Sequence, residues 1–381
     1  MKTAVFARNI PLESPIRTNT HNYAIQFQRA GWNAVWVPKL VTPWNRHRLG
    51  QVQPAMYGVR QQRLGFLFNY GGKRLNSHRL LWELFPYFPI KPGWAAMRTA
   101  GLLNPEILFS GSLETASLYK LLQPGIFIYN AHDAFSLYPN APRSLRAVEQ
   151  AVLRRADLTV TTSAMTRELL LKQSHLAPER IVNLGHGVDN GRYAKVSEPE
   201  DLKFIPRSRA VCLGTLDMQD IALTEKTVRA LPAVSFVFIG PGGKRLQTRL
   251  RKPAFANTYF LGPVPPDSVP DYLSHCDVGL IGYDMALKDT RLFGTNPMKR
   301  YDYAAAGLQT VSVDLHEYQR SPSPMYVAQS ADEFIAAVRC AVSSPRYSVD
   351  EVRAFARVND WVSKYQALIR HLADLKPGWT P

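Results

Sequence analysis

The sequence predicts an α/β protein with two doubly wound domains, each built on a parallel sheet with helices on both faces. Its 381 residues exceed what one hydrophobic core usually organises. The composition is 46% hydrophobic and 11% aromatic, which supplies enough apolar surface for two cores. In both halves of the chain, short apolar segments alternate with helix-like segments, as in parallel sheets.

Residues 1–190 are predicted to form the first domain. The opening strand is residues 3–7, and the helix after it ends at Gly31. The apolar positions of that helix are Tyr23, Ile25, Phe27 and Ala30. Five further strands are predicted at residues 35–37, 106–109, 125–129, 158–161 and 181–184. A glycine-bracketed turn at residues 185–189 then places the domain boundary near residue 190.

Residues 191–349 repeat the pattern and are predicted to form the second domain. The predicted strands are residues 210–213, 235–239, 258–261, 278–281 and 309–313. Between residues 350 and 375, apolar side chains recur every three to four positions, which predicts one long amphipathic helix. With the tail, residues 350–381 are expected to cross back over the molecule.

The cysteines and apolar runs indicate a cytoplasmic protein. Cys212, Cys276 and Cys340 form no CxxC pair and have no histidine at metal-ligand spacing, so we interpret them as buried thiols in a reducing compartment. No apolar run approaches the roughly 18 to 20 residues that cross a bilayer. The apolar stretch at residues 4–7 ends at Arg8 and is too short for a signal peptide.

The net charge of +16 is concentrated at the start of the chain. Residues 1–100 hold fourteen Lys or Arg against two carboxylates, an excess of 12. From Lys39 to Arg98, aromatic residues alternate with these cations, a mixture typical of proteins on an anionic lipid surface. A solvated basic face is one alternative, and nucleic acid is the rival partner. Because no nucleic-acid-binding motif is visible, we expect peripheral association with the inner face of the membrane and no nucleic acid.

Candidate catalytic residues follow two strands of the first domain, where ligands bind in open α/β sheets. The strand at residues 125–129 leads to His132 and Asp133, and either could remove a proton from an attacking hydroxyl. A helix-capping role is the alternative for Asp133. After the strand at residues 158–161, Ser163 is a predicted helix cap, and Glu168 lies about one and a half turns into that helix. A surface position is the alternative for Glu168.

The most informative segment is residues 296–302. Pro297 suits the first turn of a helix, so backbone donors at Met298 and Lys299 would meet a diphosphate at the positive end of the helix dipole. Lys299 adds a full charge, which would stabilise a leaving nucleoside diphosphate without a metal. Asp302, one turn later, could accept the ribose hydroxyls. An ordinary helix with an exposed lysine and aspartate is the alternative.

The sequence predicts no metal and no cofactor. The glycines at residues 240–243 follow a strand, but the Walker lysine and the spaced GxGxxG are absent. No acidic pair stands at a strand end in a setting suited to Mg²⁺ or Mn²⁺, and Asp284 and Asp289 are poorly placed for this. We therefore expect a metal-independent reaction.

Several of these motifs, taken in order, resemble GT-B glycosyltransferases, most closely the membrane-associated glucuronosyltransferases of the GumK type that act in xanthan assembly. The matching segments are residues 16–21, 129–133, 163–168, 185–189, 282–283 and 298–299. The resemblance implies an acceptor-binding first domain and a nucleotide-sugar-binding second domain. It implies inverting transfer from a UDP-sugar, with glucuronic acid as one candidate sugar, to a polyprenyl-diphosphate-linked saccharide.

The resemblance also implies roles for individual residues. Asp133 takes the position of the general base, Glu168 is an essential carboxylate, and His132 is a rival catalytic residue. The expected donor-binding residues are Gly214, Thr215, Tyr283, Asn296, Met298, Lys299 and Asp302. The expected acceptor-binding residues are Arg17, Asn19 and His21.

Two departures from the GumK pattern leave alternatives open. Asn296 and Pro297 replace a pair of serines, and Asp302 replaces a glutamine. An aspartate at residue 302 resembles the ribose-binding acid of the broad glycosyltransferase family 4, whose retaining members carry a glutamate eight residues earlier, where this chain has Gly294. Inversion is therefore favoured over retention. Two rival functions are a nucleotide-sugar 2-epimerase and a non-catalytic basic protein that binds membrane or nucleic acid.

Overall fold

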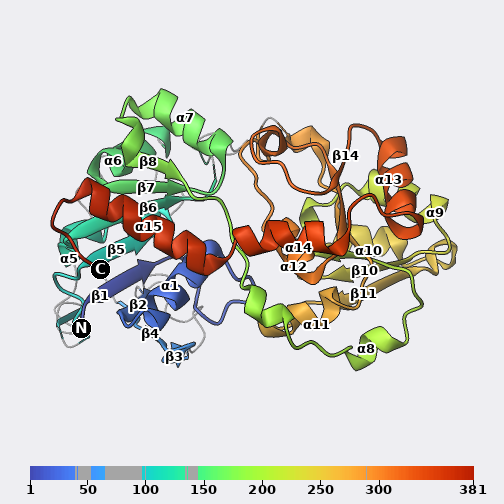
Figure 1. The fold of residues 1–381 in the computed structure, drawn as a ribbon, viewed down its shortest axis with the longest axis horizontal. Coiled ribbons are helices and arrows are strands. Elements are labelled where there is room, and N and C mark those ends of the chain that lie inside the picture. Colours follow the sequence, from blue (N-terminus) through green and yellow to red (C-terminus); the bar gives the residue numbers. More distant parts are fainter. Residues whose placement is uncertain are drawn as a thin grey trace. The chain divides into compact units, whose positions relative to one another are not determined.

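The computed structural model describes residues 1–38, 41, 53–64, 97–98, 100–133, 135, 145–288 and 290–381. They form two compact units (Figure 1). Unit 1 comprises Met1–Gly185 and Tyr365–Pro381, and unit 2 comprises His186–Lys364. The chain therefore passes from one unit to the other twice. The segment 350–381, predicted as a separate element, is divided between the two units.

Unit 1 contains an eight-stranded sheet in the order β3-β4-β2-β1-β5-β6-β7-β8. All neighbouring strands are parallel except β3 and β4. The strands are β1 Thr3–Ala7, β2 Asn33–Val37, β3 Ala55–Met56, β4 Val59–Gln61, β5 Ile107–Ser110, β6 Ile126–Ala131, β7 Leu158–Thr161 and β8 Ile181–Asn183. The six predicted strands are confirmed, whereas β3 and β4 were not predicted.

Helices cover this sheet, and their apolar faces complete the core of unit 1. They are α1 Asn19–Arg29, α4 Leu113–Ala116, α5 Tyr119–Leu122, α6 Leu145–Arg155 and α7 Ala164–Ser174, with a short 3-10 helix, η4 Pro178–Arg180. Ser163 caps α7 as predicted, because its hydroxyl accepts a hydrogen bond from the Thr166 N–H at 3.0 Å. The central strands β1, β2, β5, β6 and β7 are buried on both faces, which explains their continuous apolar runs.

Unit 2 contains a six-stranded parallel sheet in the order β11-β10-β9-β12-β13-β14. Its strands are β9 Arg209–Leu213, β10 Ser235–Ile239, β11 Thr258–Gly262, β12 Val278–Ile281, β13 Gln309–Val313 and β14 Tyr326–Ala328. The five predicted strands are confirmed, and β14 was not predicted. Strand order reverses between β9 and β12, which is where ligands bind in sheets of this kind.

The helices of unit 2 pack on both faces of its sheet. They are α8 Glu200–Lys203, α9 Ile221–Ala230, α10 Lys244–Leu250, α11 Val269–Leu273, α12 Lys299–Ala306, α13 Ala331–Ser343 and α14 Val349–Val358. Short 3-10 helices lie between them: η5 Asn190–Tyr193, η6 Leu216–Met218, η7 Pro253–Phe255, η8 Pro266–Ser268, η9 Met285–Leu287 and η10 His316–Gln319. Of these helices, α12 carries two of the predicted donor-binding residues, Lys299 and Asp302.

The prediction of one long helix over residues 350–375 is wrong. The segment forms two helices, α14 and α15 (Trp361–Leu375), both red in Figure 1. α14 ends at Val358 with Asn359 as its cap residue. Asp360 begins the second helix, because its Oδ1 accepts a hydrogen bond from the Val362 N–H at 2.8 Å. The same stretch pairs with Val188, whose N–H donates to the Asn359 carbonyl and whose carbonyl accepts from the Trp361 N–H. The three-to-four spacing of apolar residues continues through the break between the two helices. That spacing therefore could not reveal the break.

Other predictions concern the cysteines and the membrane. Cys212 and Cys276 are buried free thiols, whereas Cys340 is only half-buried. Within the described part of the chain, no helix has both the length and the apolar character to span a membrane. Most of the aromatic and cationic residues between Lys39 and Arg98 lie outside the described residues.

Candidate active site

Three predicted donor-site residues meet at the carboxyl end of β9 and β12. Lys299 is the first residue of α12, and its side chain lies across Gly214, the residue after β9. Its Nζ lies 4.9 Å from the centre of the Tyr283 ring, which follows β12. Gly214 has a φ of +99°, a conformation that favours glycine. The structure thus brings Gly214, Tyr283 and Lys299 together.

The Lys299 ammonium is buried, and no described residue supplies it with a counter-ion. The residue is 8% exposed, and its Nζ has no hydrogen-bond partner among the residues that the structure describes. Taking an ammonium out of water without an acceptor costs several kcal/mol. This cost is recovered if an anion binds against Lys299, so the arrangement suits a phosphate group.

Asp302 lies one turn after Lys299 on α12. Its Oδ1 accepts a hydrogen bond from the Tyr193 hydroxyl of η5 at 2.9 Å. Burial, and then the nearby Asp302 charge, raises the pKa of Tyr193 well above its ordinary value of 10, so the phenol keeps its proton and donates. The carboxylate is therefore held in one orientation at the edge of the site.

Asn296 is buried just before α12, and its contact with a donor stays a prediction. It is 5% exposed, and its Nδ2 donates to the Tyr301 hydroxyl at 3.0 Å. Arg300 donates to the same hydroxyl at 3.1 Å. Asn296 therefore fixes the start of α12 from within the fold. Pro297 also lies outside the helix, because α12 begins at Lys299 with the half-buried Met298 as its cap residue.

The glycines at residues 240–243 have a structural explanation. A Cβ on Gly240 would lie 2.1 Å from the Gly214 carbonyl oxygen, and one on Gly242 would lie 2.2 Å from Asp217 Oδ2. The Gly243 N–H donates to Asp217 Oδ1 at 2.8 Å. The turn thus packs directly on the loop that begins with Gly214. Thr215, in that loop, is exposed.

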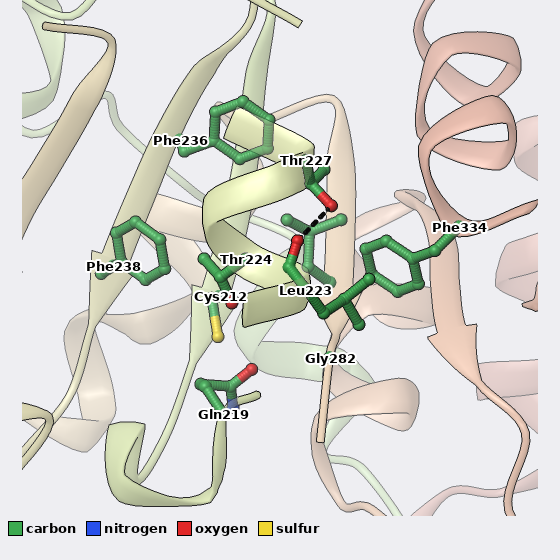
Figure 2. Close-up of a pocket in the computed structure, with 10 residues that line it drawn as sticks. Cys212, Gln219, Leu223, Thr224, Thr227, Phe236, Phe238, Gly282 and Phe334 are labelled. Atoms are coloured by element: carbon green, nitrogen blue, oxygen red, sulfur yellow. Dashed lines mark hydrogen bonds between the residues drawn. The ribbon is translucent and has the colours of Figure 1, made fainter. Parts of the chain in front are cut away.

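A small cavity lies under this edge of unit 2 (Figure 2). Its walls include Cys212 of β9, two phenylalanines of β10, Phe334 of α13, and Gly282, which follows β12. The Thr227 hydroxyl also lines the cavity and donates a hydrogen bond to the Leu223 carbonyl at 2.8 Å. Its volume is about 20 Å³. Ligand pockets commonly measure about 300 to 1,000 Å³. A nucleotide would therefore have to bind outside this cavity.

Two of the candidate catalytic residues, His132 and Asp133, belong to a network at the carboxyl end of the unit 1 sheet. Arg8, directly after β1, contacts His132 Nε2 with its Nη2 at 3.2 Å. His132 Nε2 lies 3.5 Å from Asp133 Oδ2. The Thr162 hydroxyl, after β7, donates to the His132 carbonyl at 3.0 Å. Glu168 is half-buried on α7, the helix that follows β7.

Arg8 was not predicted from the sequence. Burial lowers its pKa to about 10, and the Asp133 charge opposes this shift, so Arg8 remains protonated near neutral pH. Gly111 leaves room for it, because a Cβ there would lie 3.2 Å from Arg8 Nη1. Its position directly after the first strand was a signal available in the sequence.

Two of the three predicted acceptor-binding residues are buried and bonded within unit 1. Asn19 exchanges two amide hydrogen bonds with Asn130, at 3.0 and 3.1 Å. His21 is 2% exposed and stacks on Trp36 with ring centres 4.3 Å apart. Burial lowers the pKa of His21 to about 3, so its ring is neutral. Contact between either of these residues and an acceptor stays a prediction.

Arg17 is the member of that set with partial exposure. Its guanidinium lies 4.5 Å from the centre of the Tyr57 ring. Contact between Arg17 and an acceptor therefore stays a prediction.

Among the described residues, no group of three or more His, Cys, Asp or Glu could hold a metal ion. Asp289 lies outside them.

Solved structures match the fold over nearly the whole chain. Sucrose-phosphate synthase from Thermosynechococcus elongatus has a TM-score of 0.73 at 12% identity, covering 98% of this chain and 99% of that one. The chain has the GT-B fold. HepE from Anabaena, in complex with UDP and glucose, has a TM-score of 0.70 at 12% identity, covering 98% of this chain and all of that one. Identities this low show the fold alone, and the predicted fold class is confirmed.

Sequence comparison is less extensive. No protein-family profile matches the chain. TuaH of Bacillus subtilis (strain 168), named as a glycosyltransferase of teichuronic acid biosynthesis, is 23% identical over 251 residues. The match covers 60% of this chain and 61% of TuaH, so it spans less than two thirds of that relative. The specific resemblance to GumK-type enzymes stays a prediction.

Proposed function

We propose that the protein is a metal-independent, inverting glycosyltransferase that moves a sugar from a UDP-sugar to an acceptor hydroxyl. The buried Lys299 ammonium beside Gly214 is the observation that carries this proposal. It provides a fixed positive charge where strand order reverses, and a diphosphate is the anion that a nucleotide-sugar would place there. The UDP bound to HepE and the description of TuaH as a glycosyltransferase support the same function.

In the proposed reaction, Asp133 accepts the proton of the acceptor hydroxyl as its oxygen attacks the anomeric carbon. The bond from that carbon to the diphosphate breaks, and UDP leaves with the electron pair. Lys299 neutralises the charge that develops on the diphosphate, and Asp302 holds the ribose. A single displacement inverts the anomeric configuration.

The contacts of His132 favour Asp133 as the base. A guanidinium only donates hydrogen bonds, so His132 Nε2 must accept from Arg8 at 3.2 Å. The ring nitrogen near Asp133 therefore has its lone pair occupied. Arg8 also places a positive charge next to the His132 ring, which disfavours a second positive charge on that ring. We assign Arg8 and His132 to positioning Asp133.

The acceptor and the location of the protein are finer parts of the proposal. A polyprenyl-diphosphate-linked saccharide is the proposed acceptor, and glucuronic acid is one candidate sugar. The 12 excess positive charges of residues 1–100 support docking on an anionic membrane surface. The naming of TuaH for teichuronic acid biosynthesis supports a role in assembling a polysaccharide.

A donor panel tests the reaction. Purified protein is incubated with UDP-glucose, UDP-galactose or UDP-glucuronic acid and a polyprenyl-diphosphate-linked saccharide, with and without EDTA. We expect one donor to yield UDP and a glycoside of inverted configuration by NMR, with the same rate in EDTA. A retained configuration would support the retaining alternative. Conversion of the UDP-sugar to an epimer without acceptor would support the 2-epimerase.

A further inference from the structure

β9 and β12, the strands between which the order of the unit 2 sheet reverses, pair over a short distance. Val278 pairs with Ala210, and Gly279 pairs with Val211. On its other side, β9 pairs with β10 along all five of its residues. Past Val211, the backbone groups of β9 that point toward β12 therefore need other partners.

Tyr303 of α12 supplies a partner at this point. Its side chain is fully buried, and its hydroxyl accepts a hydrogen bond from the Leu213 N–H at 3.0 Å. The hydroxyl proton is directed to the Val211 and Leu280 carbonyl oxygens, each 3.2 Å away. One phenol thus joins the separating ends of β9 and β12. Burial raises the pKa of Tyr303 well above 10, so this proton is retained.

The ring of Tyr303 fits because residue 279 is glycine. A Cβ on Gly279 would lie 2.3 Å from Tyr303 Cδ2 and 2.4 Å from its Cγ, closer than unbonded carbon atoms approach. The ring therefore lies directly on the backbone of β12. Any side chain at residue 279 would move Tyr303, and α12 with it.

Tyr303 connects the two parts of the candidate diphosphate site. Leu213, which it holds, precedes Gly214, and Lys299 lies four residues before Tyr303 on the same side of α12. Lys299 Nζ lies 3.9 Å from the Cβ position of Gly214. We infer that Tyr303 is a positioning residue whose hydroxyl fixes the Gly214 backbone relative to the Lys299 ammonium for diphosphate binding. This inference rests on the proposed function.

The test removes the hydroxyl and keeps the ring. UDP binding is measured by calorimetry, and donor KM and kcat by UDP release, for wild type, Tyr303→Phe and Tyr326→Phe. Tyr326 is the matched control, because it is also buried and its hydroxyl is bonded, to the Arg346 N–H, but it lies on the edge strand β14. We expect Tyr303→Phe to raise the UDP Kd and donor KM about 10-fold and leave kcat within about twofold.

The outcomes separate this inference from the proposed function. Tyr326→Phe is expected to lower thermal stability without changing the UDP Kd. If Tyr303→Phe binds UDP as wild type does while Lys299→Met does not, Tyr303 only packs and the inference is wrong. If Tyr303→Phe alone fails to fold, the hydroxyl specifies the fold rather than the site, and the inference is equally wrong. No UDP binding by the wild type would instead reject the proposed function.

Discussion

Two buried ionisable residues differ in their surroundings, and the difference indicates which of them has a functional role. Lys299 stands at the open end of the unit 2 sheet, beside Gly214 and Tyr283, and suits an anion. Glu149 lies within the core of unit 1, where the Tyr129 hydroxyl is 3.4 Å from its Oε1. The charge of Lys299 can bind an anion, whereas a charge on Glu149 would only cost desolvation free energy. Each residue gives a prediction.

Replacing Lys299 by methionine should weaken nucleotide binding. The variant keeps most of the length of the side chain and removes the charge that would meet the diphosphate, so we expect the UDP Kd to rise about 10- to 100-fold. Thermal stability should be equal or higher, because an uncompensated buried charge is lost. Calorimetric titration with UDP measures the first effect, with the exposed Lys252→Met as control. A Kd within twofold of wild type would contradict the assignment.

Replacing Glu149 by glutamine should stabilise the protein in a pH-dependent way. Burial raises the pKa of Glu149 from 4.5 to about 7, so the folded state holds the proton more tightly than the unfolded state. Wild-type stability therefore falls as pH rises from about 4.5 to 7, and Glu149→Gln removes this loss. The variant should gain up to about 3 kcal/mol at pH 8 and little at pH 5. Urea unfolding at both pH values checks it, and an equal difference at both would contradict it.

At the scale of elements, the turn at residues 240–243 and the loop that begins at Gly214 fit against each other. The fit depends on glycine, because a Cβ on Gly240 would lie 2.1 Å from the Gly214 carbonyl oxygen. Gly262, at the end of the neighbouring β11, also has a positive φ, of +76°, but a Cβ there would meet nothing within 4 Å. An alanine at Gly262 would therefore meet backbone strain alone, whereas an alanine at Gly240 would meet both strain and a steric clash.

Gly240→Ala and Gly262→Ala should therefore differ. Gly262→Ala carries only backbone strain and should cost about 1 to 2 kcal/mol of unfolding free energy, with an unchanged UDP Kd. Gly240→Ala adds a clash with Gly214, so it should cost more and also weaken UDP binding. Thermal unfolding and UDP titration of both variants measure these effects. Equal behaviour of the two would show that the loop contact does not shape the site.

Elements with strong periodic signals were predictable from the sequence, and short or interrupted ones were not. The central strands are buried on both faces, so their apolar runs identify them. β3, β4 and β14 have only two or three residues and mixed burial. The helix break at Asp360 depends on pairing with Val188, 172 residues away in sequence, which local spacing cannot reveal.

Among site residues, position along the chain was easier to predict than contact. Asp133 could be placed just after a strand and Lys299 at the start of a helix, because both positions are set by local sequence patterns. Arg8 reaches its partner His132 across 124 residues, and this contact exists only in the folded unit. Asn19 and His21 stand in a motif of the resembling family, but their burial depends on Asn130 and Trp36.

At the scale of the whole molecule, each unit carries one part of the proposed reaction. Unit 1 presents Arg8, His132 and Asp133 at the carboxyl end of its sheet, and unit 2 presents Gly214, Tyr283 and Lys299 at the same end of its own. The similarity of the whole chain to solved GT-B structures agrees with this division. The basic first hundred residues add a further, separate prediction.

The protein should bind vesicles that contain anionic lipid. Residues 1–100 carry an excess of 12 positive charges, so binding should weaken as salt rises and the Debye length falls from about 10 Å at 0.1 M to 3 Å at 1 M. Cosedimentation with vesicles of phosphatidylcholine alone, or with added phosphatidylglycerol, measures it. Equal binding to both kinds of vesicle would contradict an electrostatic contact.

The central claim is that unit 1 supplies the base and unit 2 holds the donor. The most direct measurement is steady-state kinetics of UDP release by Asp133→Asn, with the exposed Glu179→Gln as control. We predict that kcat falls about 100-fold or more, the usual range for loss of a general base, while the UDP Kd and donor KM stay at wild-type values. A wild-type kcat in Asp133→Asn would contradict the account.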